Sequence, residues 1–293
     1  MKRITKIFVN LIAILMLMVS CFGLVACEDI KTLSITVEVY DMEEKVMEER
    51  TLTISLYRHL APDTVDSIVK LVNDGYYNST ENGEMFFYTM GTHKQIMLGN
   101  FLYKDGEVTF NQTMPTIHGE FEANGVVGSD LSNKEGAIGL WRTWSASGTY
   151  KENDGLANTG STTWFMPTES LASKYDGYFC VFAKFNFESG SENNEAWQDI
   201  KAMFNNGIAY YDKYEVYYTG EYDETKENCG LTANVIEYDN FDEDNIQNLF
   251  KTEGNNADAP EMYNHYTIKV PIMNKETGGA KQLGAKIVKM EIV

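Results

Sequence analysis

The chain has 293 residues, of which 43% are hydrophobic and 13% aromatic, and its formal net charge is −19. This supply of apolar side chains suits a folded core and argues against global disorder. The strong negative charge repels phosphate backbones, so a nucleic-acid partner is not expected.

The first 26 residues have the pattern of a secretory signal peptide. Lys2, Arg3 and Lys6 form a basic head, and the run from Ile7 to Val25 is mostly apolar. A basic head followed by an apolar stretch and small residues is typical of a cleaved export signal. The apolar run is near the lower length limit for crossing a bilayer, so a membrane-spanning anchor is the alternative interpretation.

The signal ends in Leu24-Val25-Ala26-Cys27, which resembles the lipobox of bacterial lipoproteins. The resemblance implies that Cys27 is lipidated and that residues 27–32 form a short linker. Loss of the three basic residues takes the net charge from −19 to −22. Anionic lipid repels such a chain, so acyl chains must hold it. We therefore expect a protein on the extracytoplasmic face of a bacterial cell membrane, bound through this lipid anchor.

The start of the mature chain predicts a hairpin and then a helix. Leu33–Val39 and Leu52–Leu56 alternate apolar and polar residues, as half-buried strands do, and 41–50 is predicted as their connection. Apolar residues then recur at helical spacing, which predicts a helical core over Val65–Asn73. The Asp74-Gly75 pair that follows is a stop signal.

The rest of the chain predicts short strands and one more helix. Glycine- and asparagine-rich turns separate short strands up to Phe187, and a second helical core is expected over Glu195–Phe204. Residues 206–265 are rich in Tyr, Asn and acidic side chains and are predicted to be an insertion before the last strand. That closing strand is expected near Ala285–Ile292. The fold class is therefore mainly β, with one domain over residues 33–293.

Five local motifs stand out along the chain. They are Ala61-Pro62-Asp63-Thr64-Val65, Gly75-Tyr76-Tyr77-Asn78-Ser79-Thr80, Glu120-Phe121, Asn158-Thr159-Gly160-Ser161-Thr162-Thr163-Trp164-Phe165 and Tyr175-Asp176-Gly177-Tyr178-Phe179-Cys180-Val181-Phe182. In this order they resemble motifs of the cyclophilins, the barrel family of peptidyl-prolyl isomerases. The resemblance implies a cyclophilin-like closed eight-stranded β-barrel capped by two α-helices.

The resemblance also places the expected catalytic position. Isomerisation of an X-Pro bond must cross a barrier of about 20 kcal/mol set by amide resonance. Cyclophilins lower it with an arginine in a Phe-His-Arg-Val run, and the matching run here, Phe86-Phe87-Tyr88-Thr89, has Tyr88 instead. A phenol donates one hydrogen bond but carries no charge at neutral pH. Arg142 is either a substitute electrophile or a surface arginine, so Tyr88 and Arg142 are the catalytic candidates.

The remaining matched positions predict an aromatic groove for an extended peptide. Its expected substrate-binding residues are Phe86, Leu98, Trp141, Thr162, Trp164, Tyr175 and Phe179. Most of the family's polar contacts are replaced, whereas aromatic walls still provide affinity without charge.

Three functions are compatible with these patterns. The first is an isomerase of weak activity that assists the folding of secreted or surface proteins by acting on proline-containing or unfolded segments. The alternative is a non-catalytic surface lipoprotein that binds extended or proline-containing peptides. A solute-binding or adhesion lipoprotein has no specific signal beyond the lipobox.

Neither a cofactor nor a metal is expected. The four histidines lack the paired spacing of a zinc site, and no phosphate loop or dinucleotide fingerprint is present. Beyond the signal peptide and Cys27, the only remaining thiols are Cys180 and Cys229. Two cysteines do not make a disulfide framework, and free thiols are favoured over a single disulfide.

Overall fold

The computed structural model describes residues 30–90, 94–112, 114–127, 131–142, 157–205, 211–219, 223, 232–237, 262–273 and 281–293. The predicted signal peptide, Cys27, Cys229 and much of 206–265 lie outside these residues. The elements are β1 (Ile30–Tyr40), β2 (Met47–Tyr57), α2 (Pro62–Asn73), β3 (Glu84–Phe86), β4 (Tyr88–Met90), β5 (Gln95–Leu98), β6 (Phe101–Lys104), β7 (Glu107–Phe110), η1 (Glu122–Asn124), β8 (Ala137–Leu140), β9 (Trp164–Pro167), α3 (Ala172–Tyr175), β10 (Val181–Lys184), α4 (Glu192–Asn205), β11 (Tyr211–Thr219), β12 (Thr232–Glu237), β13 (Met262–Met273), β14 (Gln282–Leu283) and β15 (Ala285–Ile292).

The first hairpin is longer than its alternating pattern predicts. β1 and β2 pair from Ile30↔Tyr57 to Tyr40↔Met47, so residues 47–50 belong to a strand and not to the expected connection. The turn is correspondingly tight, and the Asp41 carboxylate accepts the backbone N–H groups of Glu43 and Glu44. The polar side chains of residues 48–50 hid this extension, because the outer face of a hairpin tolerates them.

Both predicted helices are present. α2 begins at Pro62, where the missing proline N–H matters least because the first turn has no intrahelical acceptor. Its apolar face, formed by Val65, Ile68, Leu71 and Val72, is buried. α4 covers the predicted core of the second helix, and Trp197 and Ile200 on it are fully buried.

The strands close into the expected barrel. Every neighbouring pair in the ring is antiparallel, in the order β1, β2, β10, β8, β9, β5, β4–β3 and β15, and β15 pairs again with β1. β3 and β4 are separated by Phe87 alone, whose N–H donates to the carbonyl of Ala285 at 3.2 Å. If Glu84–Met90 is counted as one wall, the ring has eight walls, and the mainly β class is confirmed.

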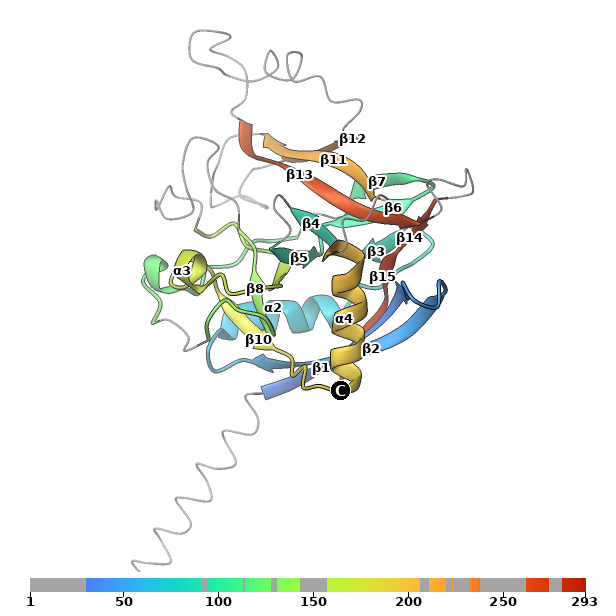
Figure 1. Cartoon of the computed structure of the whole chain (residues 1–293). Coiled ribbons are helices and arrows are strands. Elements are labelled where there is room, and N and C mark those ends of the chain that lie inside the picture. Colours follow the sequence, from blue (N-terminus) through green and yellow to red (C-terminus); the bar gives the residue numbers. More distant parts are fainter. Residues whose placement is uncertain are drawn as a thin grey trace, which may run out of the picture.

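Further strands form a second layer outside this ring. β13 pairs with β4 through Ile268↔Met90 and Lys269↔Thr89, and β11 and β12 continue the sheet outward. The β6–β7 hairpin extends the sheet from β3, with Asp105 and Gly106 at positive φ in its two-residue turn. In Figure 1 these strands lie at the end of the molecule opposite the β1–β2 hairpin.

The apolar side chains form two separate cores. The first fills the barrel and includes Leu33, Ile54, Phe87, Trp164 and Phe182. The second lies between the outside of the barrel and the added layer. It contains Phe86, Tyr88, Met97, Phe101, Tyr103, Val108, Trp141, Phe165, Phe179, Tyr214, Val216, Ile268, Val270, Ile272 and Leu283. The segment Glu84–Met90 is a wall of both cores.

The sequence pattern indicates a buried strand that contains Cys180. In the structure Cys180 lies immediately before β10 and not within it. It is a free, buried thiol. Among the described residues, no helix is both long and apolar enough to cross a membrane.

Candidate functional site

The shared strand places the first catalytic candidate on the outer face of the barrel. Alternation directs Phe86 and Tyr88 into the second core and Phe87 into the barrel. The Tyr88 ring makes edge contacts with Phe86 and Phe101 at centroid distances of 5.9 and 5.2 Å. Its exposed fraction is 0%, so Tyr88 is a packed core residue in this structure.

The same alternation divides the predicted groove residues between the two cores. On β5 and β9, Leu98 and Trp164 point into the barrel, whereas Met97 and Phe165 point outward. The Trp164 indole N–H donates to the Tyr77 hydroxyl at 3.0 Å inside the barrel. Met97 and Phe165 are therefore the neighbours of Tyr88 on the outer face. The resemblance had placed Leu98 and Trp164, the adjacent positions, in the groove.

Gly139 on β8 allows the Phe165 ring to lie flat on the outer face. A Cβ atom at this position would lie 2.3 Å from the ring's Cζ atom, far inside van der Waals contact. Register pairs Gly139 directly with Phe165. A glycine in a strand often marks such a close approach.

Three other predicted groove residues form one aromatic group at the edge of this face. Trp141 stacks on Phe179 with a centroid distance of 5.3 Å and an interplanar angle of 24°. The ring centroids of Tyr175 and Phe179 are 4.6 Å apart, and the Phe165 ring makes edge contacts with both of these rings. Trp141 and Phe179 are buried, and Tyr175 is half-buried.

Arg142, the second catalytic candidate, packs against this group. Its guanidinium carbon lies 5.2 Å from the centroid of Phe121 and 5.4 Å from that of Phe179. Its Nε donates to the carbonyl of Tyr178 at 3.2 Å. With 5% exposure, Arg142 is not the surface arginine that the sequence allowed. Its cation–π contacts and its hydrogen bond to the Tyr178 carbonyl instead link the end of β8 to the residues that precede β10.

Thr162 lies apart from Tyr88, in the turn before β9. Its hydroxyl donates to the side-chain carbonyl of Asn100, and its own carbonyl accepts the Tyr77 hydroxyl at 3.0 Å. It is 2% exposed. These bonds hold the turn against the barrel.

The outer face is covered by strands of the chain itself. Tyr214 and Val216 from β11 and Ile268, Val270 and Ile272 from β13 pack into the second core, each at most 3% exposed. Sequence reasoning missed this cover, together with Phe101, Met97 and Phe165. A peptide can reach Tyr88 only if the β11–β13 layer moves.

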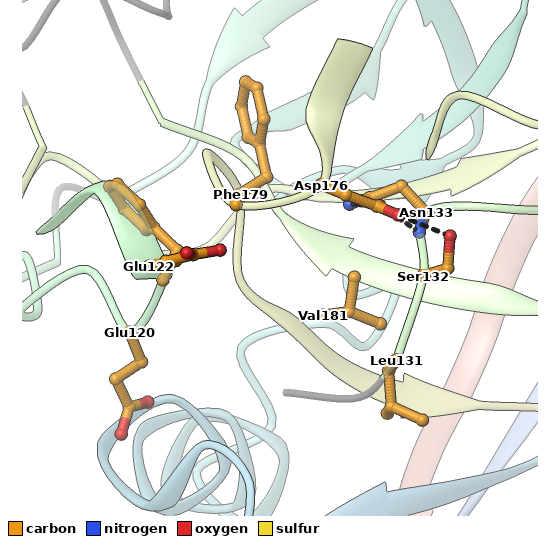
Figure 2. Close-up of a pocket in the computed structure, with 10 residues that line it drawn as sticks. Glu120, Glu122, Leu131, Ser132, Asn133, Asp176, Phe179 and Val181 are labelled. Atoms are coloured by element: carbon orange, nitrogen blue, oxygen red, sulfur yellow. Dashed lines mark hydrogen bonds between the residues drawn. The ribbon is translucent and has the colours of Figure 1, made fainter. Parts of the chain in front are cut away.

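A polar pocket lies beside the aromatic group (Figure 2). Its volume is about 230 Å³, and Phe121, Phe179, Glu122, Asp176 and Asn133 are among its lining residues. Phe121 and Phe179 are the two rings that contact Arg142, so the pocket adjoins the second catalytic candidate. Figure 2 shows Asp176 directed toward Ser132 and Asn133, with which its carboxylate makes hydrogen bonds of 2.6 to 2.8 Å.

Glu120 at the edge of this pocket has a structural partner. Its carboxylate accepts the backbone N–H groups of Asp63 and Thr64 at 3.0 and 2.7 Å. It therefore satisfies two of the unpaired donors at the start of α2, where a negative charge also complements the helix dipole. This contact gives a physical role to the Glu-Phe motif found in the sequence.

No other reactive group stands out in the described part of the chain. Burial raises the pKa of the Cys180 thiol to about 12, so it stays protonated at neutral pH and is a poor nucleophile. The described residues contain no group of His, Cys, Asp and Glu side chains that could hold a metal ion.

Comparison with known proteins finds similarity only among solved structures. No protein-family model matches the chain, and no curated protein matches it. A cyclophilin-type peptidyl-prolyl cis-trans isomerase from Cryptosporidium parvum is 13% identical, over 71% of this chain and 94% of that one, with a TM-score of 0.36. The same protein crystallised in the presence of the dipeptide Ala-Pro gives a TM-score of 0.35 at 13% identity, over 71% and 96% of the two chains. A cyclophilin from Hirschia baltica is 14% identical over 53% and 66%, with a TM-score of 0.28.

Proposed function

We propose that the protein is a cyclophilin-like folding factor of the peptidyl-prolyl isomerase class, with weak isomerase activity. Its substrates would be proline-containing or unfolded segments of secreted and surface proteins. The observation that carries this proposal is the eight-walled antiparallel ring, closed by β15 and flanked by α2 and α4.

The positions of the sequence motifs support the same proposal. Pro62 of the first motif begins α2, and the Gly75–Thr80 motif forms the turn after that helix. The Asn158–Phe165 motif leads into β9, and the Tyr175–Phe182 motif leads into β10. Each of these four motifs therefore lies at the start or end of a helix or strand, where local sequence controls the turn.

Weak activity follows from the chemistry at Tyr88. A neutral, fully buried phenol replaces the guanidinium that the resemblance places against the prolyl nitrogen. Loss of one such charge-assisted contact lowers a rate by about two to three orders of magnitude. The Arg142 guanidinium does not compensate in this structure, because it is buried between two rings.

A protease-coupled isomerisation assay on the full-length protein in detergent tests the proposal. We expect a rate above the uncatalysed one but at least about a hundredfold below that of an arginine-containing cyclophilin. Tyr88→Phe, which keeps the ring, and Arg142→Ala separate the two catalytic candidates. Efficient catalysis that neither change affects would contradict the argument from the substituted site.

The second candidate is a non-catalytic protein that binds extended or proline-containing peptides. The covered outer face favours it, because Tyr88 and Met97 have no exposed surface while the pocket in Figure 2 is open beside Phe179. Titration with proline-containing peptides, read by tryptophan fluorescence, tests it. Trp141 stacks on Phe179 near this pocket, so binding there should change the spectrum and Trp141→Phe should remove the change.

Attachment to the outer face of a bacterial membrane through lipid on Cys27 is part of the proposal. β1 begins at Ile30, so only two residues would separate the lipidated cysteine from the first strand. Cys27→Ser should release the protein from membranes or block its processing, as measured by fractionation and mass spectrometry. Unchanged attachment and processed mass would contradict the lipobox interpretation.

A further inference from the structure

Two exposed apolar side chains lie next to each other at the end of the molecule where β1 begins. Ile30 is 44% exposed and Val293 is 69% exposed. The Val293 N–H donates to the Thr32 carbonyl at 3.0 Å, so the β1–β15 ladder continues one pair beyond Leu33↔Ile292. Because Ile30 lies two residues before Thr32, Ile30 and Val293 are diagonal neighbours on the outer face of the sheet. In Figure 1 the point marked C lies close to the start of β1.

Tyr57 extends these two residues to a small patch. It is the ladder partner of Ile30 on β2, so its half-buried ring lies on the same outer face. The ring makes an edge contact with the exposed His59 at a centroid distance of 5.9 Å. Tyrosine combines an apolar ring with a polar hydroxyl, which suits a boundary between water and lipid. We call Ile30, Tyr57 and Val293 the β1 patch.

The position of the β1 patch in the chain decides what covers it. Only Glu28 and Asp29 separate Ile30 from the proposed lipid attachment at Cys27. Three Cα–Cα steps span at most about 11 Å, so a lipidated Cys27 brings Ile30 within that distance of the membrane interface. Helices that lie on a membrane bury their apolar side chains about 5–10 Å deep in this interface, so the β1 patch is within reach of the lipid.

The charges along the β1–β2 hairpin favour contact at this end and not at the other. Lys31 and Arg58 are the basic residues that adjoin the patch in the sequence, and Arg58 forms an ion pair with Asp66 at 2.7 Å. The hairpin turn at residues 41–46 carries three carboxylates and one ammonium group. This turn begins after Tyr40, which is ten residues from Ile30 and about 33 Å away along the strand. An anionic membrane surface therefore repels the turn more strongly than the β1 patch.

We propose that the β1 patch rests in the headgroup region of the bilayer that holds the Cys27 anchor. The start of β1 then faces the membrane, and the β11–β13 layer at the opposite end of the molecule faces the solution (Figure 1). This proposal rests on the proposed lipidation of Cys27, and it adds an orientation that lipidation alone does not fix. The lipid surface is the occupant because the anchor holds it at this end of the chain. A polypeptide substrate then approaches the cover from the solution side.

Fluorescence quenching by lipid tests this orientation in the lipidated protein, reconstituted into vesicles of phosphatidylcholine and phosphatidylglycerol. A fluorophore on Thr32→Cys reports on the patch, because Thr32 lies on the same outer face. Val46→Cys is the matched control, since Val46 is similarly exposed, at 49%, but lies in the hairpin turn. We expect a lipid that carries a nitroxide to quench the fluorophore at residue 32 and not the one at residue 46. All labelled proteins carry Cys229→Ser, and Cys180 is buried away from the label.

Substitutions in the patch connect this signal to its side chains. Ile30→Asp combined with Val293→Asp places charge in the patch and should lower the quenching at residue 32, whereas Val46→Asp should leave it unchanged. These side chains are exposed, so we expect the fold to be retained, which circular dichroism checks.

Mass spectrometry and vesicle flotation test the anchor separately from the patch. Flotation without preferential quenching at residue 32, or quenching there that the paired Asp variant does not lower, would overturn the proposal and leave the anchor intact. Absence of lipid on Cys27 would overturn both.

Discussion

The barrel interior and the covered outer face are both dry, but they are enclosed in different ways. Hydrogen-bonded strands surround the interior on every side, and its side chains are mostly aliphatic. The second core is richer in aromatic residues, and its outer boundary is the β11–β13 layer and the β6–β7 hairpin. Among the described residues, β7 pairs only with β6 and β12 only with β11, so backbone pairing does not close this second enclosure.

The difference predicts an order of opening. Separating the barrel walls breaks ladder hydrogen bonds on both sides of each strand. Of the backbone hydrogen bonds among the described residues, lifting the cover breaks only the two-residue pairings of β13 with β4 and β14 and the hydrogen bond from the Gly284 N–H to the Pro271 carbonyl, and it exposes apolar rings. Regions with fewer closing interactions open at lower free energy than the global fold. The outer layer should therefore open before the barrel, which is the motion that access to Tyr88 requires.

Two neighbouring residues on β9 provide the largest test. Trp164→Ala empties space inside the barrel and removes the bond to Tyr77, so we expect a loss of about 3–5 kcal/mol in the free energy of global unfolding. Denaturant titration measures this loss. Phe165→Ala is the matched control, because it removes a ring from the second core. Hydrogen exchange should then accelerate mainly in β11 and β13, and equal acceleration in all strands would remove the distinction between the cores.

The cover itself can be weakened through a side chain that it packs against the barrel. Ile268 on β13 is fully buried and is the ladder partner of Met90, so Ile268→Ala should lower the free energy of local opening by about 2–4 kcal/mol. Hydrogen exchange should show this in β11 and β13 while β1 and β2 stay protected. If the cover limits access, the same variant should bind a proline-containing peptide more tightly. Uniform loss of protection would mean that cover and barrel unfold as one unit.

The buried Cys180 thiol should make the free energy of unfolding depend on pH at alkaline pH. Its folded-state pKa is about 12, above the usual thiol value, so the folded protein holds this proton where the unfolded chain has lost it. Stability from this group is complete below about pH 8.5 and falls by about 1.4 kcal/mol per pH unit above it, until the folded pKa is reached. The difference in stability between the wild type and Cys180→Ala should change by this slope between pH 9 and 10, because other titrating groups contribute equally to both proteins. Parallel curves would mean that the thiol is hydrated.

The smallest expected effect is at Tyr88. Tyr88→Phe preserves the ring contacts with Phe86 and Phe101, so the free energy of unfolding should change by about 1 kcal/mol or less. Thermal unfolding measures it. A loss above about 3 kcal/mol would show that the hydroxyl, and not the ring, holds the second core together.

The sequence predicts what local patterns determine. The first two strands, both main helices and the closing strand follow from alternation, helical spacing and stop signals, and the structure confirms them. Side-chain direction on β5 and β9 did not follow, because a single-position shift in a motif match exchanges the two faces of a strand. Leu98 and Trp164 were predicted to line the groove, whereas the structure places Met97 and Phe165 on the face that holds Tyr88.

The cover was beyond sequence reasoning for a different physical reason. β11 is a tyrosine-rich strand without an aliphatic run, and its burial depends on β13 and the barrel face, both distant in the sequence. The alternating apolar residues Tyr214 and Val216 are the local sign of a buried face. The sequence therefore predicted residues 206–265 only as an insertion and not as the strands of an added sheet.

The shared wall Glu84–Met90 has an evolutionary consequence. Phe86, Phe87 and Tyr88 alternate between the two cores, so one inserted or deleted residue here would exchange the contents of both at once. The turn at residues 41–46 joins two strands at the surface and contributes no side chain to both cores. Length variation among descendants of this chain should therefore accumulate in that turn, while the seven-residue wall keeps its length even as its side chains drift.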